Sequence, residues 1–230
     1  MFPHTKERLD MEFNQVVHGR RSIRAFLPDP IPRDQIKRIV DLGRWAPSWG
    51  NVQPWEIVVA DGQKVKQLAS AFQEEFAKSS ARRSDILMPQ EFPELYKKRY
   101  VKLGKGLLTY IGIRREDKQG RAQHYLKMYE FFGAPAVLYL IIDGRLNEPY
   151  SCLDVGSIGT TICYAAVQEG LGTIYLASAA YFADIVKKVL EIPDDKKVVV
   201  GIAIGVPHPE APESLFRSDR EPLEDILRFA

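Results

Sequence analysis

The feature that most constrains the fold is residues 135–142, where Pro135 is followed by Ala-Val-Leu-Tyr-Leu-Ile-Ile. A half-buried strand alternates apolar and polar residues, whereas an unbroken apolar run is typical of a strand buried on both faces. The run is too short to cross a bilayer. We therefore predict a buried strand, and 230 residues, of which 45% are hydrophobic, are enough to build a core around it.

The rest of the chain alternates between helical and extended patterns. Apolar residues at spacings of three and four predict helices, and short apolar runs between turn formers predict strands. The predicted helices cover residues 10–18, 34–46, 62–77, 152–169 and 183–190, and the further strands cover 56–60, 173–176 and 197–204. Helices separate the strands and no linker or repeat interrupts the pattern, so one α/β or α+β domain over residues 1–230 fits best.

Two segments stand apart from this pattern. Residues 79–130 mix basic and aromatic residues, which can indicate base stacking on a nucleic acid. Acidic residues intervene, among them Glu91 and Asp117, so solvated helices that form an excursion from the domain are favoured. Residues 206–230 carry four prolines and predict a C-terminal arm that wraps a neighbour or the same domain.

Charge and cysteine content narrow the function classes. The formal net charge is only +2, which gives no support to a general nucleic-acid or membrane-surface role. Cys152 and Cys163 lie three turns apart in one predicted helix, so they are not placed to form a disulfide, and the histidines are too scattered for a metal site. Reduced thiols and a start without the apolar run of a signal peptide predict a cytoplasmic protein.

Three arginines crowd into residues 20–24 as Arg20-Arg21-Ser22-Ile23-Arg24, next to the apolar Ala25-Phe26-Leu27. Cations so close to a buried stretch repel one another unless an anion lies between them. A phosphate suits the planar donors of arginine and the serine hydroxyl. The alternatives are a solvated basic loop or, for Arg24, an ion pair with a helix carboxylate.

Common catalytic motifs are missing from the sequence. It contains no G-x-S-x-G elbow, no Walker A motif and no G-x-G-x-x-G motif. A chain with an anion site and little acid–base machinery points to a bound cofactor that carries the chemistry.

Four motifs occur in one order along the chain, which resembles the FMN-dependent nitroreductase family. R-R-S-x-R-x-F begins at Arg20, and A-P-S-x-x-N-x-Q-P-W begins at Ala46. G-L-G-T begins at Gly170, and G-x-P at Gly205 is followed by the tail Arg220-Glu221-Pro222-Leu223-Glu224-Asp225. The long middle segment and Phe131-Phe132-Gly133-Ala134-Pro135 are most similar to the nitrobenzoate-reductase-like branch.

The resemblance implies an α+β sandwich in which helices flank a mostly antiparallel sheet, and an intertwined homodimer with FMN at its interface. Arg20 and Ser22 would bind the FMN phosphate together with Arg220, and Arg21 would assist through its backbone or the ribityl chain. Arg24 would lie near flavin N1 and the C2 carbonyl, where a fixed cation stabilises the charge that the ring gains on reduction.

The other expected site residues come from two further motifs. Pro47, Ser48 and Trp49 would line the flavin from the partner subunit, and Asn51 would order their loop or reach the flavin edge. The resemblance also implies that Leu176, Ala177 and Ser178 present backbone donors to N5 and O4. Simple interface packing for Trp49 and turn stabilisation for Asn51 are the alternatives.

The implied activity is hydride transfer from NAD(P)H through flavin N5 to a small electron-poor aromatic acceptor, such as a nitroaromatic or quinone. Ala179-Ala180 replaces the glutamate and glycine of several branches, which leaves NADH and NADPH open, and the bulky Trp49 favours flat aromatic acceptors. Flavin fragmentation, reductive dehalogenation or non-enzymatic binding of a phosphorylated ligand or nucleic acid are the alternatives.

Overall fold

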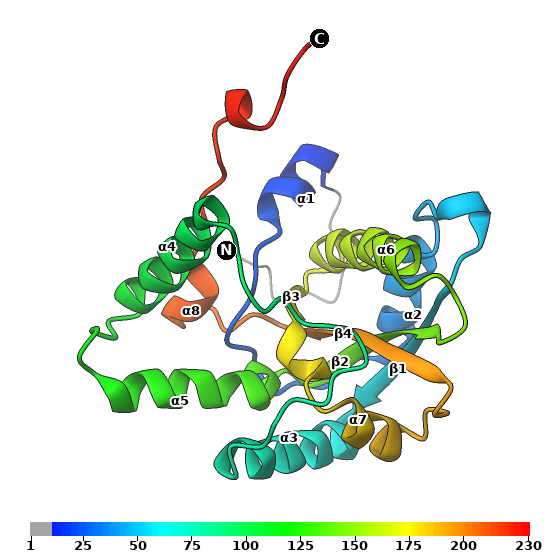
Figure 1. The fold of residues 1–230 in the computed structure, drawn as a ribbon, viewed down its shortest axis with the longest axis horizontal. Coiled ribbons are helices and arrows are strands. Elements are labelled where there is room, and N and C mark those ends of the chain that lie inside the picture. Colours follow the sequence, from blue (N-terminus) through cyan, green and yellow to red (C-terminus); the bar gives the residue numbers. More distant parts are fainter. Residues whose placement is uncertain (1–10) are drawn as a thin grey trace.

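One antiparallel sheet forms the centre of the computed structural model, which describes residues 11–230. Its four strands lie in the order β1 (Trp55–Asp61), β2 (Ala136–Asp143), β4 (Lys196–Gly205) and β3 (Gly172–Leu176), and each pair is antiparallel. β2 pairs on both sides and is buried along all but its last residue. The unbroken apolar run is therefore an inner strand, as predicted (Figure 1).

Helices account for most of the remaining structure between residues 11 and 230. The α-helices are α1 (Phe13–Gly19), α2 (Arg33–Gly43), α3 (Gly62–Ala77), α4 (Glu94–Tyr110), α5 (Lys118–Tyr129), α6 (Glu148–Gln168), α7 (Ala183–Leu190) and α8 (Pro212–Leu215). Short 3-10 turns are η1 (Trp49–Asn51), η2 (Phe131–Gly133), η3 (Ala177–Ala180) and η4 (Leu223–Asp225).

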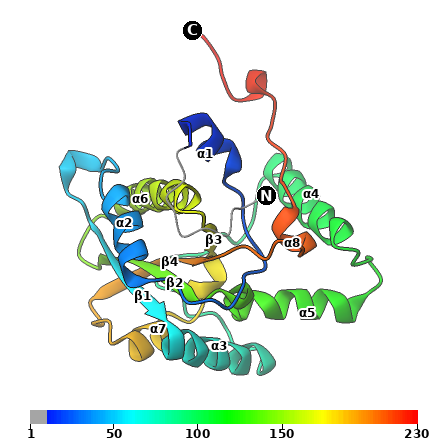
Figure 2. The same ribbon diagram turned by 180° about the vertical axis from the view of Figure 1, so that it is seen from behind.

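Each face of the sheet packs against its own set of helices. Val137, Tyr139 and Ile141 point into a core shared with α3 and α7, whereas Leu138 and Leu140 point into a core shared with α2 and α6. Figures 1 and 2 show these helices on opposite sides of the strands. The predicted α+β sandwich is confirmed.

The contact between α2 and α6 depends on a glycine. A Cβ placed on Gly43 would lie 2.6 Å from Cγ1 of Ile162, so only glycine permits this approach. The sequence contained this signal, because a glycine inside an otherwise amphipathic helix costs about 1 kcal/mol and indicates a close neighbour.

The structure differs from the sequence-based boundaries at α6, which begins at Glu148 rather than at 152. The side chain of Asn147 accepts from the Tyr150 N–H and caps a polar first turn that has no apolar periodicity. Residues 79–130 contain two regular helices, α4 and α5. Their periodicity is weak because α4 buries only Leu107 and therefore has no wide apolar face.

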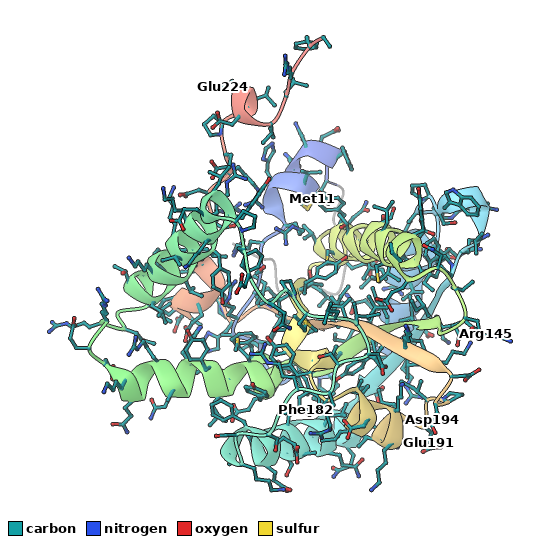
Figure 3. The ribbon with its side chains drawn as sticks, viewed as in Figure 1. Met11, Arg145, Phe182, Glu191, Asp194 and Glu224 are labelled. Carbon is teal, nitrogen blue, oxygen red and sulfur yellow. The ribbon has the colours of Figure 1, made fainter. Side chains whose placement is uncertain are left out.

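The C-terminal arm leaves the body beyond α8 (Figures 1 and 2). Figure 3 places Phe182 in the interior beside α3 and α7, whereas Glu224 lies on the projecting arm. The arm exposes large apolar side chains: Leu223, Ile226, Leu227 and Phe229. No helix between residues 11 and 230 is long and apolar enough to cross a membrane.

Candidate functional site

The arginine segment, residues 20–24, lies along the open edge of β3. Ser22 forms a parallel bridge with Thr173, and the Ile23 N–H donates to the Thr173 carbonyl at 3.0 Å. A Cβ on Gly172 would lie 2.5 Å from Cγ1 of Ile23 and 2.7 Å from Cγ of Pro207. The glycine of the G-L-G-T motif therefore lets the segment dock on the sheet, and the buried Ile23 fixes it there.

The C-terminal segment holds the arginines from the other side. The Ser214 hydroxyl donates to the Ala25 carbonyl at 2.8 Å, and Nε of Arg21 donates to the Ser214 carbonyl at 2.6 Å. Nη1 of Arg217 donates to the His18 carbonyl at 2.6 Å. The first and last motifs of the sequence thus meet in space.

The segment gathers partly buried positive charge. Burial lowers the pKa of Arg24, whose Nη1 donates to the Ser22 carbonyl at 3.2 Å. Burial and then the charge of Arg217 lower the pKa of Arg21. Neither Arg20 nor Arg24 forms an ion pair with a carboxylate within residues 11–230, so the ion-pair alternative for Arg24 finds no support there. Such a group of cations suits a bound anion.

The turn after β3 extends this site along the sheet edge. Leu176 ends β3 in the core, Ala177 is exposed, and Ser178 is buried with its Oγ 3.5 Å from the Met128 carbonyl. Thr173 and Leu176 are three residues apart on one strand, about 10 Å. The arginines and this turn can therefore contact opposite parts of one elongated ligand.

The loop with Pro47, Ser48, Trp49 and Asn51 lies on α6. The Trp49 N–H donates to Oδ1 of the buried Asp154 at 3.0 Å, and the Gln53 N–H donates to the Ser48 hydroxyl at 3.0 Å. Asn51 has a φ of 56° and its carbonyl accepts from the Gln53 amide at 3.2 Å, so it orders the loop. The Trp49 side chain is 65% exposed.

Helix α6 separates this loop from the arginine segment. Asp154 holds the loop, whereas Val167, near the other end of the helix, would lie 3.4 Å from a Cβ on Gly19. Thirteen residues of α-helix between these anchors span about 20 Å. A single chain does not bring the two motifs together, as their places at opposite ends of α6 in Figure 1 show.

Arg220 and Arg217 differ in position. Nη1 of Arg220 donates to the Ser218 hydroxyl at 2.9 Å and to the Asp219 carbonyl at 2.8 Å, within its own exposed segment. Arg217, two residues beyond α8, is the tail arginine whose charge acts on Arg21. The sequence analysis missed Arg217, and the only available signal was a second arginine three residues before Arg220.

A second residue that the sequence analysis missed is His124 on α5. Its side chain is 7% exposed, and the Arg24 charge contributes to lowering its pKa. Nothing in the spacing of the four histidines indicated that one of them lies by the arginine segment.

The chain is thus an α+β protein with a cationic site at the edge of its sheet. A family model described as "Nitroreductase family" matches residues 17–206, and the chain belongs to this family. A protein of Pseudomonas putida named 4-nitrobenzoate reductase is 34% identical over 220 residues, which cover 95% of each chain. The predicted family and its nitrobenzoate-reductase-like branch are confirmed.

Solved structures agree with this assignment. The FMN and NADPH-dependent nitroreductase NfnB from Sphigopyxis sp. strain HMH has a TM-score of 0.90 at 27% identity, with coverage of 96% of this chain and 99% of that one. The FMN-dependent nitroreductase NfnB from Mycobacterium smegmatis, solved in complex with NADPH, has a TM-score of 0.88 at 26% identity, with coverage of 94% and 97%.

Proposed function

We propose that the protein is an FMN-dependent oxidoreductase that transfers hydride from NAD(P)H to an electron-poor aromatic acceptor, such as a nitroaromatic or quinone. The observation that carries this proposal is the set of partly buried arginines at the edge of β3, in which Arg20 and Arg24 have no carboxylate partner between residues 11 and 230. The names of the relatives supply the reaction class. FMN, when bound, supplies the hydride acceptor at N5.

The arginine segment would bind the cofactor at two points. Arg20 and Ser22 hold the phosphate with help from Arg217, and Arg220 joins them when the arm folds back. Arg24 stabilises negative charge on the ring, and a charge-assisted contact of this kind contributes roughly 1.5–3 kcal/mol. Leu176, Ala177 and Ser178 orient the opposite edge of the ring through their backbone.

A second copy of the chain would complete the site. Pro47, Ser48, Trp49 and Asn51 are presented outward on α6, about 20 Å from the arginines of their own chain. The arm also exposes apolar side chains that a homodimer would cover. We therefore infer a homodimer in which each site combines the arginine segment of one chain with the loop of the other.

The choice of donor depends on the surroundings of η3. Ala179 and Ala180 are 0% and 1% exposed, and Ala179 Cβ would lie 2.5 Å from a Cβ on Gly201. These two side chains therefore pack in the core rather than reach a nicotinamide. Activity with NADH and with NADPH, measured side by side, decides the preference.

The visible spectrum of the purified protein tests the proposal. We expect a yellow protein that NADH or NADPH bleaches without oxygen and that 4-nitrobenzoate reoxidises. Arg20→Ala and Arg217→Ala should each lose FMN on dialysis, whereas Arg33→Ala, an exposed arginine paired with Asp61, should retain it. A protein that stays colourless with added FMN would rule out a flavin enzyme. Flavin breakdown under oxygen, or halide release from a halogenated aromatic, would identify the alternative flavin chemistries.

A further inference from the structure

The imidazole of His124 lies in the wall of the candidate site without a partner for one of its nitrogens. Its side chain is 7% exposed, and its ring lies 6.2 Å from the rings of Tyr125 and Phe132. The buried Nδ1 has no hydrogen-bond partner in the part of the chain that the structure describes. A buried polar atom left in this way costs about 1–3 kcal/mol, so it is usually explained by a ligand or by a proton that moves.

The turn beside His124 is strained. Phe131 and Phe132 have φ values of 53° and 56°, in the left-handed region that large side chains rarely adopt, and Gly133 follows at 76°. Each such residue costs about 1–3 kcal/mol and persists only where the surrounding structure imposes it, most often at ligand sites. This turn holds the Phe132 ring against the imidazole and is a second, independent sign of a functional position.

The charged groups that face His124 come from three elements. Burial, followed by the Arg24 charge, lowers its pKa, Lys127 on α5 lowers it further, and Glu213 on α8 raises it. Lys127 and Glu213 are themselves paired at 2.9 Å, so their effects largely offset each other. The turns η2 and η3 carry no charged side chain. Arg24 therefore dominates the field, and His124 is neutral at pH 7.

We propose that His124 is the proton-accepting partner of Arg24, so that an anion binding against the Arg24 guanidinium is accompanied by uptake of one proton at His124. This inference rests on the proposed flavin site. The anion would be a delocalised one, either the pyrimidine edge of the flavin after reduction or the carboxylate of an aromatic acid in the acceptor position.

The charge balance for the flavin case is simple. A hydride brings two electrons and one proton to N5 and leaves one negative charge on the ring. A proton from solvent then goes to the His124 imidazole rather than to the ring, and the buried site gains no net charge. His124 acts through the field at Arg24 and is a positioning residue. An aromatic carboxylate would draw a proton to it by the same attraction.

Nitrogen NMR of the histidines in the holoenzyme tests this directly. The His124 pKa should lie below 6.5 in the oxidised enzyme and rise by at least one unit after anaerobic reduction with dithionite or after addition of benzoate to the oxidised enzyme. Reduction alone identifies the flavin as the anion, and benzoate alone identifies the acceptor. His18 and His208 should not respond, and His124→Gln assigns the signal. An unchanged His124 pKa in both arms overturns the proposal.

A binding measurement gives an independent readout. The affinity of the apoprotein for reduced relative to oxidised FMN should change by up to tenfold per pH unit between the two His124 pKa values, because one proton is linked to binding. His124→Gln should remove this one-proton component and His208→Gln should keep it, with thermal unfolding as a check on folding. If the component survives in His124→Gln, the proposal is wrong. If the wild-type chain binds no FMN, the proposed function fails instead.

Discussion

The arginine segment and the loop Pro47–Asn51 are both motifs of the same family, yet they are held in different ways. The segment is fixed between β3 and the C-terminal residues around Ser214, and much of its surface is buried. The loop has one backbone bond to Asp154 and carries the exposed Trp49. One half of the site is therefore formed within the chain, and the other half is directed away from it.

The difference indicates a division of labour. A site that discriminates charge needs donors that are fixed before the ligand arrives, because their ordering then costs nothing on binding. The arginine segment meets this requirement. The loop needs only to be presented at the correct distance, and a single anchored turn achieves this. The predictions below test the two halves separately, beginning with the largest effect.

Gly172→Val should damage the arginine segment most severely. The new side chain would displace Ile23 and Pro207, and overpacking of this kind costs up to about 3 kcal/mol. Thermal unfolding should show the loss of stability, and FMN should dissociate on dialysis. Gly104→Ala is the matched control, because a Cβ there meets nothing within 4 Å and alanine favours the helix. A fully stable Gly172→Val protein would contradict the docking described for β3.

Arg24→Gln should weaken FMN binding without unfolding the protein. The loss of a charge-assisted contact worth roughly 1.5–3 kcal/mol corresponds to a tenfold to hundredfold rise in Kd, measured by flavin fluorescence. Arg33→Gln removes an exposed charge of the same kind and should bind FMN normally. Equal Kd values for the two variants would show that Arg24 does not face the cofactor.

Asp154→Ala should affect the loop and leave the arginine segment intact. The Trp49 N–H loses its acceptor, and an unpaired donor of this kind costs about 1–3 kcal/mol, so acceptor reduction should fall by about tenfold or more. Asp154→Asn keeps an acceptor oxygen and should recover most of the rate.

Mixing the Arg24→Gln and Asp154→Ala proteins tests whether the site is shared between chains. Hybrid dimers would contain one site with both halves intact, so activity should recover to at most about a quarter of wild type if subunits mix at random. No recovery after verified subunit exchange would place both halves of the site in one chain.

Tyr175→Phe should have the smallest effect. The Tyr175 hydroxyl donates to the Gly156 carbonyl at 3.2 Å and joins β3 to α6, so its loss should cost about 1 kcal/mol. Burial raises the Tyr175 pKa from 10.0 to about 12, so the folded state holds this proton more tightly than the unfolded state. Stability should therefore fall as pH rises from 10 toward 12, and this part of the loss should be absent in Tyr175→Phe. Denaturant unfolding at several pH values measures it.

The sequence predicted the features that depend on local pattern. The inner position of β2 followed from its unbroken apolar run, and the close approach of α2 to α6 followed from Gly43. The order of the strands did not follow, because pairing depends on contacts between distant segments.

The candidate site was predictable only to the same extent. Its motifs were visible, but the approach of Arg217 rather than Arg220 depends on how α8 packs on Ala25. The burial of His124 depends on the left-handed backbone of Phe131 and Phe132, and no residue pattern predicts two adjacent phenylalanines in that conformation. Positions set by tertiary packing were therefore the ones that sequence reasoning missed.

Helix α6 also works as a ruler. It anchors the loop at one end and the arginine segment at the other, so its length sets the spacing between two motifs that never touch within the chain. One inserted residue would turn one end by about 100° relative to the other, whereas seven would nearly restore the facing and lengthen the spacing by about 10 Å. Variation in this helix should therefore occur in whole turns, even at positions where no side chain contacts a ligand.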